Sequence, residues 1–181
     1  MFLSRHLKSP FFSLPFLFCL ISFTLSAQNK TINGPIGSGE FGNTVAILPN
    51  GNYVVTDPLF DNAQADVGAV YLYNGATHAL ISTLTGSTAN DKIGNGGITV
   101  LANGNYVVRS QNWDNGGIFD AGAATWCSGT TGRTGTISVS NSLVGSTTND
   151  QIGSFGIISL TNGNYVVNSP NWDNGAIANT G

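Results

Sequence analysis

The sequence has 181 residues, enough for a domain with its own core, but only 8% of them are charged and the formal net charge is −3. The few cations beyond residue 27 are scattered, so the sequence lacks the basic footprint of a nucleic-acid-binding protein, and nucleic acid is not an expected partner. Abundant Gly, Asn, Thr and Val favour a turn-rich β protein over a helical one.

Residues 1–27 are typical of a secretory signal peptide. A positively charged start precedes an apolar run over 11–23, and small residues follow that run. The run contains Pro15 and is shorter than the ~20 apolar residues of a membrane-spanning helix, which is the alternative interpretation. We therefore expect an exported protein, secreted or at the cell surface, with cleavage before Ala27 or Gln28 and no transmembrane segment after cleavage.

One six-residue phrase, Asn-Gly-Asn-Tyr-Val-Val, occurs three times, at 50–55, 103–108 and 162–167. Asn-Gly between two β-prone runs is a strong hairpin signal, and we expect a type I′ turn, in which Asn and Gly both have a positive φ. The copies recur with a period of roughly fifty to sixty residues, so the chain is a repeat protein. We divide it into a lead-in (28–40), a first unit (41–91), a second unit (92–150) and a partial third unit (151–181).

Each complete unit holds four β-prone runs, and the third unit supplies the first two. These runs cover 45–48, 53–56, 69–73 and 80–84 in the first unit, and 98–101, 106–110, 123–127 and about 135–139 in the second. Four antiparallel strands per period predict an all-β, β-propeller-like array of blades, with a solenoid as second choice. Because closed propellers have four to eight blades, we expect an incomplete fragment that can self-associate through its uncovered blade face.

The phrases at 41–46, 50–58 and 67–73 resemble an FG-GAP repeat, the blade motif of integrin-α-type propellers. Over 34–181, the recurring Gly-Ser-Thr-x-Asn-Asp and Asn-Trp-Asp-Asn-Gly phrases also resemble an uncharacterised repeat of long bacterial haemagglutinin-like surface proteins. These resemblances imply a propeller fold and a role in adhesion. FG-GAP repeats often carry a calcium loop between the first two strands, but the corresponding residues 49–52 contain no carboxylate, so the resemblance does not extend to the metal.

Carboxylates gather after the second strand of each unit, and they are the candidate metal ligands. The group comprises Asp57, Asp61 and Asp66 in the first unit, Asp114 and Asp120 in the second, and Asp173 in the third. Their spacing does not match a calcium loop, and Asp at repeated turn positions usually accepts hydrogen bonds from its own backbone. We expect no metal site and no cofactor.

Phe60, Trp113 and Trp172 recur at one loop position and are the candidate ligand contacts. Aromatic rings on one face of a repeat array can stack on sugars or grip a protein, so a glycan or a protein at the cell surface is the expected partner. The alternative is that each ring fills the gap between neighbouring blades.

Residues with catalytic potential are sparse. His78 stands beside no nucleophile motif, and Cys127, next to a Trp in an apolar run, is best explained as a small core residue. The sequence therefore predicts no catalytic residue and an exported, non-catalytic repeat protein that acts as an adhesion or carbohydrate/protein-binding module. The alternative is an accessory repeat module of a secreted enzyme whose catalytic domain is not in this chain.

Overall fold

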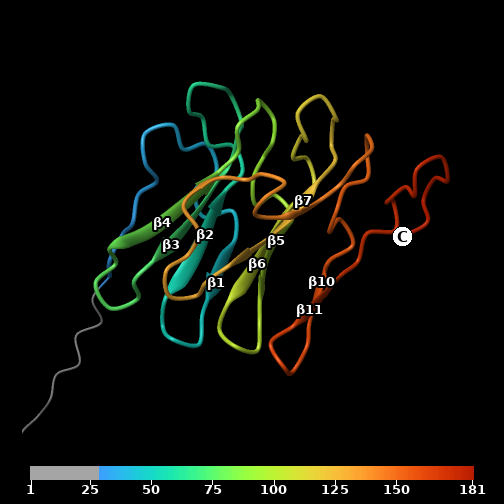
Figure 1. Cartoon of the computed structure of the whole chain (residues 1–181). Coiled ribbons are helices and arrows are strands. Elements are labelled where there is room, and N and C mark those ends of the chain that lie inside the picture. Colours follow the sequence, from blue (N-terminus) through green and yellow to red (C-terminus); the bar gives the residue numbers. More distant parts are fainter. Residues whose placement is uncertain (1–28) are drawn as a thin grey trace, which may run out of the picture. The chain divides into compact units, whose positions relative to one another are not determined.

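A computed structural model describes residues 29–181, and the regular secondary structure in that range is β (Figure 1). The sheets lie in one compact unit, Asn33–Gly181. The signal peptide predicted over 1–27 lies outside the described residues. Within the described range, no helix is long and apolar enough to cross a membrane.

The first unit supplies strands β1 to β4 of the first sheet, and all four of its predicted runs are strands. The strand order of this sheet is β1-β2-β3-β4-β8, and the β1–β2, β2–β3 and β3–β4 pairs are antiparallel. The strands are β1 (Val45–Ile47), β2 (Tyr53–Asp57), β3 (Ala69–Tyr73), β4 (Leu80–Thr85) and β8 (Gly135–Thr136).

The second sheet repeats this arrangement in the order β5-β6-β7-β9, and the third unit contributes the hairpin β10–β11. The strands are β5 (Gly97–Val100), β6 (Tyr106–Ser110), β7 (Ala123–Cys127), β9 (Leu143–Val144), β10 (Ile157–Ser159) and β11 (Tyr165–Val167). β5 contacts both β1 and β10, so the first hairpins of the three units are neighbours. The predicted fold class, an all-β array of repeated antiparallel units, is confirmed.

The prediction for the last strand of the second unit was wrong. β9, not 135–139, pairs with β7, while β8 leaves its own unit and pairs in parallel with β4 of the first sheet. We call residues 132–137 the crossover segment. Its last residue, Ile137, holds this segment against the first sheet. The Ile137 side chain is 3% exposed and lies in the core between the sheets. The Ile137 N–H donates a hydrogen bond to the Thr85 carbonyl at 3.1 Å.

The hairpins form where predicted, but the type I′ turn was also wrong. Gly51 has a φ of 86°, whereas Asn50 does not have a positive φ. The Gly51 N–H donates to the Leu48 carbonyl at 2.9 Å, and the Leu48 N–H donates to the Asn52 carbonyl at 2.8 Å. This is a three-residue loop in which a type I turn precedes a left-handed Gly. Pro49, whose φ suits the first central position of a type I turn, explains the difference in this copy.

Two apolar layers hold the three units together. Between the first and second sheets lies a buried cluster that includes Val54, Leu72 and Leu84 from the first sheet and Tyr106 and Val108 from the second. A smaller cluster of Leu101, Val107, Ala124 and Ile152 lies between the second sheet and the third hairpin. Since successive residues of a strand point to opposite faces, β6 and β7 of the second sheet contribute to both layers.

Candidate functional site

The Gly-Ser-Thr-x-Asn-Asp phrase ends in a carboxylate that joins consecutive units. Asp91 is fully buried, and its Oδ2 accepts hydrogen bonds from the N–H groups of Ser87 and Thr88, each at 2.8 Å. Its Oδ1 accepts a third hydrogen bond from the Asp114 N–H of the next unit, at 3.0 Å. Burial raises the pKa of the Asp91 carboxyl above its ordinary value, against the opposing effect of these hydrogen bonds.

Asp150 repeats this arrangement between the second and third units. Its carboxylate accepts hydrogen bonds from the N–H groups of Ser146 and Thr147 and from the Asp173 N–H, at 2.7, 2.9 and 3.0 Å. The Thr147 hydroxyl donates a further hydrogen bond. Burial disfavours the charged form here too, but the Thr147 hydroxyl and the backbone N–H groups lower the pKa of Asp150 below its ordinary value.

The candidate metal ligands are part of the turns. Asp61 accepts a hydrogen bond from the Asp66 N–H at 2.7 Å, and Asp114 accepts one from the Asp120 N–H at 2.8 Å. The equivalent bond of Asp173 comes from the Asn179 N–H at 2.8 Å. The interpretation as turn acceptors is confirmed for Asp61, Asp114 and Asp173. Within 29–181, no group of three His, Cys, Asp or Glu side chains is arranged to hold a metal ion.

Asp57, the first of the candidate metal ligands, accepts hydrogen bonds from the lead-in and not from its own turn. It is fully buried, and its Oδ1 accepts hydrogen bonds from the Glu40 N–H at 2.7 Å and the Gly39 N–H at 3.3 Å. It therefore fixes the lead-in against the first sheet.

The three candidate aromatic contacts do not share a surface. Trp113 is 4% exposed and belongs to the buried cluster between the first two sheets, where it cannot contact a ligand. Trp172 packs, partly buried, against the smaller cluster. The Phe60 ring lies on the first sheet, with its centroid 6.3 Å from that of Tyr71 and the two rings nearly perpendicular. Packing between units accounts for both tryptophans.

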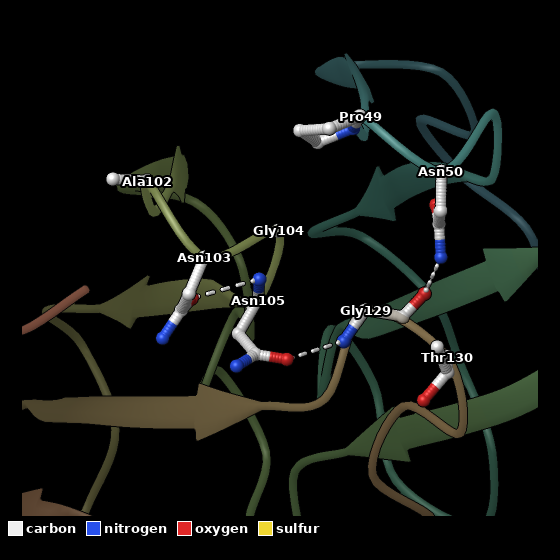
Figure 2. Close-up of a pocket in the computed structure, with 8 residues that line it drawn as sticks. All are labelled: Pro49, Asn50, Ala102, Asn103, Gly104, Asn105, Gly129 and Thr130. Carbon is white, nitrogen blue, oxygen red and sulfur yellow. Dashed lines mark hydrogen bonds between the residues drawn. The ribbon is translucent and has the colours of Figure 1, made fainter. Parts of the chain in front are cut away.

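Sequence reasoning missed a cleft where the first two hairpins meet (Figure 2). Its volume is about 390 Å³, and among the described residues that line it none is charged. The lining residues are Pro49, Asn50, Ala102, Asn103, Gly104, Asn105, Gly129 and Thr130. They come from the β1–β2 loop, the β5–β6 loop and the loop after β7.

Gly129 is the residue through which the two hairpins are joined. Its carbonyl accepts hydrogen bonds from Asn50 Nδ2 at 2.9 Å and Asn52 Nδ2 at 3.0 Å, and its N–H donates to Asn105 Oδ1 at 3.0 Å. A Cβ at Gly129 would lie 2.0 Å from the Gly104 carbonyl oxygen, so the loops can approach this closely only with glycine. Figure 2 shows the hydrogen bonds that join Gly129 to Asn50 and to Asn105.

The polar groups left free in the cleft suit a neutral ligand. Asn105 Nδ2 makes no hydrogen bond to another described residue, although Asn52 Nδ2 at the equivalent position does. Pro49 and Ala102 add apolar surface beside these amides. The sequence feature that points to this cleft is the repeated Asn-Gly-Asn, whose first two copies line it; we interpreted these copies as turns alone.

Comparison with known families agrees with the repeat organisation. Residues 47–95, 100–154 and 159–181 each match a family described as a repeat of unknown function (DUF5650). Neither the curated proteins nor the solved structures contain a match to the chain. The match supports the repeats and lends no support to the FG-GAP resemblance.

Proposed function

The chain belongs to the DUF5650 repeat family, and from this premise we propose that it is an exported, non-catalytic binding protein of the cell surface. In this proposal the repeats form a scaffold, and the cleft between the first two hairpins holds a neutral glycan. Adhesion to a glycan-bearing surface would be the biological result.

The observation that carries the proposal is the uncharged, amide-rich lining of that cleft. Its volume of about 390 Å³ falls in the range of small-molecule sites, ~300–1,000 Å³. Asparagine side chains both donate and accept hydrogen bonds, as sugar hydroxyls do, and Pro49 and Ala102 offer surface to the C–H faces of a sugar.

The hydrogen bonds between units support a rigid site. Gly129 ties the two hairpins together, and the buried Asp91 fixes the second unit to the first. A site held by packing and hydrogen bonds loses little conformational entropy when a ligand binds.

A glycan array probed with the full chain tests the proposal, and a steric block at the cleft locates the site. We expect binding to neutral glycans and its loss in Ala102→Tyr, because the exposed Ala102 lines the cleft and a tyrosine there would occupy it. Thr161→Tyr is the matched control, since Thr161 holds the same position in the third hairpin and does not line the cleft. Absence of glycan binding, or equal binding by Ala102→Tyr, would contradict the proposal.

Export is tested separately. Amino-terminal sequencing of the protein outside the cytoplasm should begin at Ala27 or Gln28. An intact Met1 on exported protein would disprove cleavage of residues 1–27.

A further inference from the structure

Several asparagines of the chain are followed by glycine, and the structure separates these pairs by the hydrogen bond that the glycine N–H makes. The asparagines are Asn33, Asn50, Asn74, Asn95, Asn103, Asn115, Asn162 and Asn174. In an Asn-Gly pair the glycine nitrogen can attack the side-chain carbonyl carbon of the asparagine, because glycine has no side chain to obstruct the approach. We propose that Asn33, Asn115 and Asn174 are sites of spontaneous deamidation in the folded protein, and that the fold protects the other pairs.

The reaction needs water as its only co-reactant. The glycine nitrogen bonds to Cγ of the asparagine, and the Cγ–Nδ2 bond breaks. The departing Nδ2 takes up the proton that the glycine nitrogen gives up and leaves as ammonia. Water then opens the cyclic imide at one of its C–N bonds, which gives aspartate when the bond to Cγ is cleaved and isoaspartate when the bond to the main-chain carbonyl carbon is cleaved.

The tips of the three hairpins hold the attacking nitrogen in a hydrogen bond. The N–H groups of Gly51, Gly104 and Gly163 donate to the carbonyl of the leucine three residues earlier, at 2.9, 2.9 and 3.0 Å. Oδ1 of the preceding asparagine accepts a hydrogen bond from the N–H two residues later, at 3.1, 3.1 and 3.0 Å. Because both reacting groups are held, deamidation at a hairpin tip requires local opening of the loop.

Two further pairs are protected by contacts with more distant residues. The Gly96 N–H donates to the Arg109 carbonyl at 3.1 Å, and the Gly75 N–H donates to Asn52 Oδ1 at 3.4 Å. Asn74 is also fixed, since its Oδ1 accepts hydrogen bonds from the N–H groups two and three residues later, at 3.0 and 2.9 Å. In all the protected pairs the glycine N–H therefore already donates a hydrogen bond.

A second kind of turn leaves the glycine N–H without a partner. The Asn115 N–H donates to the Ile118 carbonyl at 3.0 Å, and the Ile118 N–H donates to the Asn115 carbonyl at 3.2 Å. Gly116, between them, has a φ of 63°, is exposed, and its N–H donates to no described residue. The turn at 174–177 repeats both hydrogen bonds, at 2.9 and 3.2 Å, and the φ of 63° at Gly175. The free N–H is thus a property of this turn, and water can reach it.

The pair in the lead-in is free for a different reason. Asn33 is exposed, and its side chain makes no hydrogen bond to a described residue. The Gly34 N–H makes none either. Both reacting groups are therefore available without any opening of the sheets.

Deamidation of Asn115 would remove a contact within the second unit. Asn115 Nδ2 donates to the Gly145 carbonyl at 3.1 Å, which holds the turn against the residue that follows β9. This nitrogen leaves as ammonia, so neither product can make the bond. Asn50 and Asn103 of the glycan cleft belong to the protected pairs, so the inference does not depend on the proposed function.

Peptide mapping of the full chain after incubation at mildly alkaline pH, folded or in urea, tests the proposal. Trypsin yields two adjacent peptides that form a matched pair: 93–109 contains the protected Asn95 and Asn103, and 110–133 contains Asn115. The measurement is the increase in mass when NH₂ is replaced by OH. In the folded protein, peptide 110–133 should react about as fast as in urea, whereas 93–109 should react at least about tenfold more slowly than in urea, because it reacts only from an opened state.

Variants locate the reaction within the peptide. Asn115→Gln should abolish the mass increase of 110–133, because a glutamine side chain would have to form a larger ring and reacts far more slowly. Asn112→Gln is the matched control in the same peptide and should leave the increase unchanged. Fragmentation of peptides 31–92 and 134–181 should place their modifications at Asn33 and Asn174.

Three results would overturn the proposal. The first is a folded protein in which peptide 93–109 reacts as fast as it does in urea. The second is a peptide 110–133 that reacts in urea and stays unmodified in the folded protein. The third is an unchanged mass increase in Asn115→Gln.

Discussion

The buried carboxylate of Asp91 accepts a hydrogen bond from the backbone N–H of Asp114, at 3.0 Å, across the boundary between the first two units. Asp150 and Asp173 make the same bond, also at 3.0 Å, across the next boundary. The aspartate that ends each Gly-Ser-Thr-x-Asn-Asp phrase thus accepts a hydrogen bond from the aspartate of the Asn-Trp-Asp-Asn-Gly phrase in the following repeat. Spacing between the phrases is constrained by this pairing as well as by the strands.

Asp91→Ala should lower the free energy of unfolding by about 2–4 kcal/mol, because it removes the buried acceptor that the N–H groups of Ser87, Thr88 and Asp114 share. Asp61→Ala is the matched control: Asp61 is exposed and serves one N–H group, so its loss should cost less than about 1 kcal/mol. Urea titrations of the two variants compare these costs. Equal destabilisation would show that the buried junction has no special role.

Asp91 and Asp150, which hold the same position in consecutive repeats, should change the pH dependence of the unfolding free energy in opposite directions. The pKa of Asp150 is lowered from 3.8, so its contribution is present above that value and is lost as the pH falls through the folded pKa. Asp150→Asn should therefore make the loss of stability below about pH 4 shallower.

Asp91 has the reverse effect because its pKa is raised from 3.8. Between that value and the folded pKa the folded protein binds more protons, so Asp91 favours folding as the pH falls. Asp91→Asn should make the decline with acid steeper just above about pH 4. The measurement is the slope of the unfolding free energy against pH, and slopes that change in the same direction would disprove the assignment.

Gly129→Ala should destabilise the protein by about 1–3 kcal/mol, because its Cβ would lie 2.0 Å from the Gly104 carbonyl oxygen and force the two loops apart. Gly117→Ala has open space around its Cβ and should change stability by no more than about 0.5 kcal/mol. Thermal unfolding of the pair measures the difference. If Gly129→Ala also lost glycan binding while Gly117→Ala kept it, the closeness of the loops would be linked to the site.

Cys127 should not react with a thiol reagent while the protein is folded. It is 1% exposed, and burial raises the pKa of its thiol to about 12, so at pH 8 it is protonated and inaccessible. The chain has two cysteines, and Cys19→Ser leaves Cys127 as the remaining one. Ellman's reagent should give less than a tenth of the signal that appears in denaturant, and rapid labelling of the native protein would contradict the burial.

Much of the fold could be predicted because repeats report the local pattern several times. The runs 69–73, 106–110 and 123–127 match β3, β6 and β7 residue for residue. The pairing of β8 with β4 could not be predicted in this way, since its two exposed residues carry no periodicity and its partner is a strand of another unit.

The sites were less accessible to prediction than the strands. Trp113 and Asp91 stood out as repeated residues, but a sequence does not say which side of a turn a ring or carboxylate will face. Trp113 is buried because it packs in the cluster between the first two sheets. Asp91 accepts a hydrogen bond from the N–H of Asp114 in the following unit. The glycan cleft depends on Gly129, whose importance lies in its distance from Gly104.

The crossover segment bears on the order in which the protein is completed as it leaves the ribosome. Translation delivers the chain from its amino terminus at ~5–20 residues per second, and β4 emerges well before the β8 strand that covers its edge. Until Ile137 arrives, the first sheet keeps an open strand edge and a vacancy in its core. The sheet of the first repeat is therefore completed by a strand of the second repeat. A nascent chain that stops before residue 135 would expose the unpaired edge of β4, which favours aggregation.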